Sequence, residues 1–221
     1  MNNMNEVAQK VAESLLQIKA IKLQPKKPFV WASGWKSPIY CDNRVTLSHP
    51  PIRTYIRQKL SELIQEEFGS VEMISGVATA GIPQGVLVAQ DLGLPFTYVR
   101  SSSKDHGRKN LIEGEVVSGQ RVVVVEDLIS TGKSSLKAVQ ALRDAGCNVV
   151  GLVSIFTYGF SDAEKNFAEA KCRYISLCDY ETLLEVGAKH NYILAKDIDV
   201  LKQWRLDPSN WDVPANAGAD Q

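Results

Sequence analysis

Four consecutive valines followed directly by two acids constrain this chain more than any other segment. Val122 to Val125 precede Glu126 and Asp127. A run of four β-branched residues is accommodated in a strand whose sheet is covered on both faces. Two neighbouring carboxylates are costly to bury without a function. We therefore expect the acids to lie at the carboxyl edge of a buried parallel sheet, where such sheets bind ligands.

The residues after the acids predict a site for a phosphorylated sugar. A pair of carboxylates accepts hydrogen bonds and matches the two donors of a ribose diol. Ser130, Thr131 and Gly132 then lead into a helix whose first amides and positive dipole end suit a phosphate. Glycine at 132 allows close backbone approach. Glu126 and Asp127 are thus predicted to hold the 2- and 3-hydroxyls, and residues 130–134 the 5-phosphate.

This run is also compatible with two other interpretations. Gly132-Lys133-Ser134 matches the end of a nucleotide-binding P-loop. That motif requires glycine at position 127, where this chain carries Asp127, whose charge would repel a triphosphate. An ordinary strand, turn and capped helix would leave the two acids unexplained.

The rest of the chain alternates strand-like and helical segments, which predicts an α/β fold with a parallel sheet. Residues 29–47 are expected to be extended or looped, and to contribute to a site. Periodicity predicts helices over residues 4–20, 51–68, 83–92, 134–144, 162–170 and 180–186. Strands are predicted over residues 73–77, 96–99, 122–125, 149–155 and 173–177.

Composition excludes several functional classes. Lysine plus arginine equals aspartate plus glutamate at 25 each, so no global field favours nucleic acid or acidic membranes. The four cysteines lack metal-site or disulfide-framework spacing, which is typical of a reducing compartment. No apolar run approaches the roughly 20 residues of a membrane helix. We expect a cytoplasmic protein with neither a nucleic-acid nor a membrane partner.

Two further loops follow predicted strands. Residues 100–119 are rich in glycine, serine and charged residues, and they concentrate cations. This composition is typical of a mobile lid that covers an anionic ligand. A solvated surface loop is the alternative interpretation of its composition. Residues 77–83 carry small side chains that let main-chain amides approach an anion.

These segments resemble the type I phosphoribosyltransferases. The run from Glu126 to Ser134 resembles their phosphoribosyl pyrophosphate motif. Residues 29–42, FVWASGWKSPIYCD, resemble the signature of the orotate phosphoribosyltransferases, and Lys104-Asp105-His106-Gly107 resembles their mobile catalytic loop. The resemblance covers about residues 5–200, and the three motifs in this order are far more specific than any one alone.

The resemblance implies a fold and a reaction. The fold is the type I phosphoribosyltransferase fold, a central parallel β-sheet flanked by helices with a small N-terminal hood. The reaction transfers ribose 5-phosphate from phosphoribosyl pyrophosphate to orotate, giving orotidine 5-monophosphate and pyrophosphate in pyrimidine (UMP) biosynthesis. It also implies Mg²⁺, carried by the substrate, and a homodimer with shared active sites. Three segments are predicted: residues 1–48, N-terminal helix and hood; 49–206, core; and 207–221, C-terminal tail.

By the same resemblance, functional roles fall on specific residues. The catalytic residues would be Lys104, His106 and Asp127. Phosphoribosyl pyrophosphate would be bound by Thr79, Ala80, Arg100, Lys104, His106, Glu126, Asp127, Leu128, Ile129, Ser130, Thr131, Gly132, Lys133 and Ser134. Of these, Arg100, Lys104 and His106 would act in the site of the neighbouring subunit. Orotate would be bound by Ser33, Gly34, Lys36, Tyr40, Cys41 and Ser130.

The chain also departs from some members of the family. Lysines present there are replaced by Ala32, Ala80 and Ser101 or Ser102, and an arginine near Tyr158 is missing. Main-chain amides around residues 33–41, with Ser130, would then hold the orotate carboxylate. A transferase for another base, and a non-catalytic, RNA-binding regulator that senses nucleotides, remain the alternatives. Neutral charge and a complete lid argue against the regulator.

Overall fold

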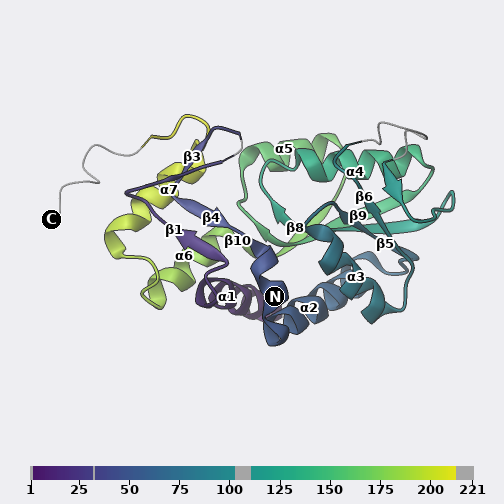
Figure 1. The fold of residues 1–221 in the computed structure, drawn as a ribbon, viewed down its shortest axis with the longest axis horizontal. Coiled ribbons are helices and arrows are strands. Elements are labelled where there is room, and N and C mark those ends of the chain that lie inside the picture. Colours follow the sequence, from purple (N-terminus) through teal and green to yellow (C-terminus); the bar gives the residue numbers. More distant parts are fainter. Residues whose placement is uncertain (1, 32, 103–110, 213–221) are drawn as a thin grey trace.

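The protein is described here by a computed structural model covering residues 2–31, 33–102 and 111–212. Its central sheet has the order β10-β9-β8-β5-β6-β7 (Figure 1). The first five are parallel and confirm the five predicted strands: β5 (Met73–Val77), β6 (Phe96–Val99), β8 (Arg121–Ile129), β9 (Asn148–Thr157) and β10 (Tyr174–Asp179). Within the three described ranges, no helix is both long enough and apolar enough to cross a membrane.

The valine strand lies in the middle of this sheet and is covered on both faces, as predicted. Val123 and Val125 pack into the core formed with α1 (Asn2–Gln17), α2 (Pro50–Phe68), α3 (Gly81–Leu92) and α6 (Tyr180–Lys189). Val122 and Val124 pack into a second core with α4 (Lys133–Asp144) and α5 (Ser161–Glu169). The two helix layers lie on opposite sides of the sheet in Figure 1. All four valine side chains are completely buried, so β8 is fixed in position.

A small lobe lies beside the sheet. We call residues 21–48 the hood. In it β1 (Ile21–Leu23) pairs with β4 (Ile39–Cys41), and β2 (Phe29–Val30) pairs with β3 (Lys36–Ser37), both antiparallel. A 3-10 helix, η1 (Asn43–Ser48), leads back to the core. This agrees with the extended or looped character predicted for residues 29–47 only up to residue 42, because η1 makes residues 43–47 helical.

The structure corrects the sequence prediction in four places. The first helix ends at Gln17 rather than near residue 20, because Lys19 adopts a left-handed φ of 57° before β1 begins. Residues 100–119 are not one loop, since β7 (Ile112–Glu113) pairs antiparallel with β6 at the sheet edge. Strand β8 continues past the valines to Ile129. The sequence prediction also missed η2 (Ala195–Asp197) and α7 (Ile198–Leu206), which lies along the hood in Figure 1.

Candidate active site

The acid strand and the small-residue loop meet at the carboxyl edge of the sheet. Helix α3 begins at Gly81, where a Cβ atom would lie only 2.6 Å from the carbonyl oxygen of Val125. Glycine therefore allows the first turn of α3 to lie directly against β8. Thr79 and Ala80, just before this helix, thus lie near the acids, and Thr79 is exposed. The structure brings these two predicted segments together.

Glu126 is buried, and both of its carboxyl oxygens have partners. Oε1 accepts a hydrogen bond from the main-chain N–H of Asp127 at 3.0 Å, and Oε2 accepts one from the Ser135 hydroxyl at 3.1 Å. Burial, with the neighbouring Asp127 charge, raises the Glu126 pKa well above its ordinary value. Both oxygens of Glu126 are therefore already hydrogen-bonded within the protein. Ser135 was missed because a serine in a helix gives no sequence signal of such a contact.

Asp127 is the more accessible acid and is tied to the hood. Its carbonyl oxygen accepts a hydrogen bond of 2.7 Å from the side chain of Asn43, a buried residue of η1. Burial raises the pKa of the Asp127 carboxyl, and its hydrogen bond with Glu126 opposes that shift. Asn43 therefore links the base of the hood to the acid strand. Sequence reasoning missed it, because only the fold brings positions 43 and 127 together.

The predicted phosphate loop is braced by α5 and leaves its amides available. Gly132 has a φ of +76°, and a Cβ there would lie 2.5 Å from the Phe167 ring. The Thr131 carbonyl accepts a hydrogen bond of 2.9 Å from the Asn166 side chain. Among the described residues, no protein group accepts a hydrogen bond from the N–H groups of residues 130–134. A helix N-terminus with unpaired amides is an anion site.

The remaining members of this run differ in accessibility. Ser130 and Thr131 are partly exposed, and Lys133 and Ser134, in the first turn of α4, are exposed. Ile129 is completely buried in the core shared with α4 and α5, whereas Leu128 is partly buried against the core on the opposite face of the sheet. The two hydrophobic residues of the predicted binding run therefore contribute mainly packing and main-chain atoms.

The predicted orotate residues in the hood fall into two groups. Ser33, Gly34, Lys36 and Tyr40 are exposed, and the Lys36 ammonium forms an ion pair of 2.8 Å with Asp212. Cys41 is buried, its thiol contacts the Asn43 side-chain oxygen at 3.2 Å, and burial raises its pKa well above the ordinary value. Cys41 is thus a neutral thiol that supports Asn43.

The structure describes residues 100–102 and 111–119 at the two ends of the predicted lid, but not residues 103–110. The Arg100 amide donates to the Leu111 carbonyl at 2.8 Å, which closes the segment between β6 and β7. The Arg100 guanidinium lies 3.5 Å from the Glu113 carboxylate. Lys104 and His106 lie outside the described residues.

Comparisons with known proteins agree with this architecture. Residues 46–182 match the family model of the phosphoribosyl transferase domain, so the class is that of the phosphoribosyltransferases. The chain is 58% identical over 201 residues to an orotate phosphoribosyltransferase of Phocaeicola vulgatus, covering 91% of this chain and 95% of that protein.

Two solved structures extend the comparison. An orotate phosphoribosyltransferase of Aeropyrum pernix superposes with a TM-score of 0.73 at 30% identity, covering 83% of this chain and 99% of that one. The Mycobacterium tuberculosis orotate phosphoribosyltransferase in complex with 5-phospho-α-D-ribosyl 1-diphosphate has a TM-score of 0.62 at 26% identity, covering 80% and 98%. The chain belongs to the orotate phosphoribosyltransferase family.

The raised pKa of Glu126 makes a prediction about stability. Above the ordinary glutamate pKa of 4.5, the unfolded chain releases this proton while the folded chain retains it, so the group's contribution to stability declines as pH rises. Glu126→Gln removes this titration and keeps a side chain of similar shape. In urea titrations, the free energy of unfolding is measured for Glu126→Gln and for the unaltered protein. The value for the variant minus the value for the unaltered protein should increase from about pH 5 to about pH 8.

The matched control is Glu169→Gln, an exposed residue at the end of α5. Its difference from the unaltered protein should stay constant across the same pH range. A constant difference for Glu126→Gln as well would show that the Glu126 proton is not retained on folding.

Proposed function

We propose that this edge of the sheet binds phosphoribosyl pyrophosphate and transfers its ribose 5-phosphate to orotate, producing orotidine 5-monophosphate and pyrophosphate. The observation that carries the proposal is the juxtaposition of Asp127 with the unpaired amides of residues 130–134. A carboxylate for the ribose hydroxyls and a helix N-terminus for the 5-phosphate are thereby placed on one strand-loop-helix unit. The enzyme would accordingly be a pentosyltransferase.

Each end of the substrate meets a different part of the site. The 5-phosphate would accept hydrogen bonds from the amides of residues 130–134 and the hydroxyls of Ser130, Thr131 and Ser134. Asp127 would accept hydrogen bonds from the ribose hydroxyls. Glu126, bonded to Ser135, would mainly fix the main chain of Asp127. The pyrophosphate would lie near Thr79 and Ala80, whose loop follows β5 next to β8.

The transfer creates positive charge on the sugar carbon as pyrophosphate departs. The protein must therefore stabilise the leaving anion and exclude water from the cation. The cationic residues Arg100, Lys104 and His106 are proposed for the first task, on the strength of their sequence pattern. The hood is proposed for the second, because Asn43 holds it against the acid strand.

Orotate would be held between the hood and the phosphate loop. Its planar ring carries a carboxylate, for which Ser130 and the main-chain amides of residues 33–41 are the proposed donors. Because Lys36 already forms an ion pair with Asp212, it would have to leave that partner to contact the substrate. The amides of Gly34, Trp35 and Ile39 likewise already donate within the hood, so we assign the larger role to Ser130.

We also propose that Mg²⁺ arrives on the substrate. Mg²⁺ commonly retains several waters and is held by one or two carboxylates together with substrate phosphates. Asp127 offers one such carboxylate, and among the described residues no group of three or more histidine, cysteine, aspartate or glutamate side chains could hold a metal. This donor set fits an ion held chiefly by pyrophosphate. When bound, the ion would neutralise charge on the leaving group.

A spectroscopic assay tests the reaction and its metal requirement. The protein is mixed with phosphoribosyl pyrophosphate, Mg²⁺ and one base at a time from a panel, and the change in the ultraviolet absorbance of each base is followed. We expect loss with orotate, little turnover of purines or uracil, and no turnover when EDTA replaces Mg²⁺. Turnover of another base in place of orotate would refute the substrate assignment, and EDTA-resistant turnover would refute the metal assignment.

Removing the charge of Asp127 should weaken ribose binding. Asp127→Asn replaces an acceptor-only carboxylate with an amide, so we expect the KM for phosphoribosyl pyrophosphate to rise about tenfold, the effect of one lost charge-assisted hydrogen bond. Asp199→Asn, which removes an exposed charge from α7, is the matched control and should leave KM unchanged. An unchanged KM in Asp127→Asn would exclude Asp127 from the ribose site.

We further propose a homodimer, acting in the cytoplasm, in which the lid of one subunit completes the site of the other. The lid begins beyond β6, and β5 separates β6 from the acid strand β8. Arg100 pairs with Glu113 on the edge strand β7 rather than with either acid. Both observations support a lid that reaches outward from its own sheet. The four cysteines are free and buried, which supports a reducing compartment.

Complementation between two impaired variants, assayed at low phosphoribosyl pyrophosphate, tests the shared site. If Lys104 acts on the partner, a dimer of one Asp127→Asn and one Lys104→Ala subunit contains one site with both residues intact. Co-produced variants should therefore recover about a quarter of the normal activity under random pairing, although each variant alone is impaired. Activity no higher than the average of the two separate variants would show that Lys104 acts within its own subunit, or that no dimer forms.

A further inference from the structure

The C-terminal helix α7 contacts two parts of the molecule that surround the proposed orotate site. The Arg205 guanidinium donates from Nε to the Tyr158 carbonyl at 3.0 Å and from Nη2 to the Gly159 carbonyl at 3.1 Å. The adjacent residue Trp204 donates from its indole N–H to the Lys36 carbonyl of the hood at 3.1 Å. Two consecutive residues of α7 therefore hold both the turn after β9 and the hood.

The turn held by Arg205 lies beside the phosphate loop. The Tyr158 amide donates to the Ile129 carbonyl at 3.1 Å, the last residue of β8 before Ser130. Phe160, at the end of the same turn, immediately precedes α5, whose Asn166 bonds to the Thr131 carbonyl. Displacement of the Tyr158 carbonyl would thus be transmitted directly to the end of the acid strand.

The contact with Trp204 continues into a buried aromatic cluster that spans the hood and the turn. The Trp31 ring of the hood lies 5.6 Å from Trp204 and 5.2 Å from Tyr158, between ring centroids. Tyr158 stacks on Phe160 at 5.2 Å, with ring planes only 8° apart. Trp204 and Tyr158 are almost completely buried. Aromatic packing of this kind is rigid, so it fixes the distance between hood and turn.

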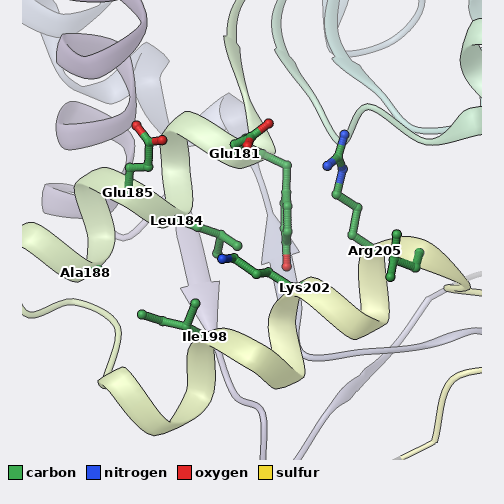
Figure 2. A pocket seen from close by; sticks show the side chains of 9 residues that line it. Glu181, Leu184, Glu185, Ala188, Ile198, Lys202 and Arg205 are labelled. Atoms are coloured by element: carbon green, nitrogen blue, oxygen red, sulfur yellow. The ribbon is translucent and has the colours of Figure 1, made fainter.

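Gly159 is adapted to this arrangement. It has a φ of +62°, and a Cβ atom at this position would lie 2.9 Å from Nη2 of Arg205. A side chain here would therefore be strained and would crowd the guanidinium. Figure 2 shows the Arg205 side chain leaving α7 away from Leu184 and Ile198, which line the groove between α6 and α7. Its charged end donates to the turn, and Arg205 also lines one side of this groove.

From these contacts we propose that Arg205 is a positioning residue for orotate: with Trp204, it sets the spacing between the hood and the Tyr158–Gly159 turn, and hence the width of the base site. This inference rests on the proposed function. Residues 205 and 204 lie beyond residue 182, where the phosphoribosyl transferase domain match ends. Orotate recognition therefore depends on a helix outside the domain that binds the phosphorylated sugar.

The test compares the two substrates separately. Arg205→Ala removes both hydrogen bonds, so we expect the KM for orotate to rise about tenfold, while the KM for phosphoribosyl pyrophosphate stays within about twofold. Arg205→Lys keeps the charge but cannot form the two-pronged contact, and should give an intermediate KM for orotate. Lys202→Ala, an exposed residue one turn earlier on α7, is the matched control and should behave like the unaltered protein.

A binding measurement without turnover complements the kinetics. All four tryptophans of the chain, at positions 31, 35, 204 and 211, belong to or pack against the core around the hood, so tryptophan fluorescence reports on this region. Titration with orotidine 5-monophosphate should show weaker binding for Arg205→Ala, whereas titration with pyrophosphate should not differ.

The outcomes separate a positioning role from a structural one. Equal increases in both KM values, or a lower melting temperature with unchanged KM values, would overturn the proposal, as would a normal KM for orotate. Should Arg205→Ala fail to fold, Arg205→Lys decides, and a normal KM for orotate in that variant overturns the proposal. Absence of orotate turnover in the unaltered protein would instead refute the proposed function, and this inference with it.

Discussion

The burial of one strand between two helix layers is the constraint on which the site depends. Because Val122 to Val125 are completely enclosed, β8 cannot shift or rotate without exposing apolar surface on one face or the other. The residues that follow are consequently delivered to a fixed place at the carboxyl edge. The acids and the phosphate loop owe their position to hydrophobic packing, which is insensitive to whether a ligand is bound.

Around this fixed edge, short polar contacts adjust the site. Asn43 ties the hood to the Asp127 carbonyl, Asn166 holds the Thr131 carbonyl, and Ser135 occupies one oxygen of Glu126. All three use a side chain from one element to hold the main chain or carboxylate of another. Such contacts align several elements to a fraction of an ångström, which is what a site for a strained, charged transition state requires.

The two acids, although adjacent, are unequal. Glu126 is buried and hydrogen-bonded, whereas Asp127 retains access to the edge. Burial raises the pKa of both carboxyls, and the charge of Asp127 adds to the shift of Glu126. This upward shift lessens the negative charge that an incoming phosphorylated substrate meets.

The sequence by itself determined the class of fold, the central strand, the position of the acids and the phosphate loop, because these depend on local patterns: a valine run, adjacent acids, and a glycine before a helix. Only the tertiary structure decided that β7 joins the sheet edge, that Glu126 is already hydrogen-bonded, and that Lys36 is paired with Asp212. It alone brought Asn43 to the acid strand and Arg205 to the turn after β9. These features depend on contacts between residues up to 176 positions apart, and no local pattern encodes which distant side chains the packing of the core will bring together.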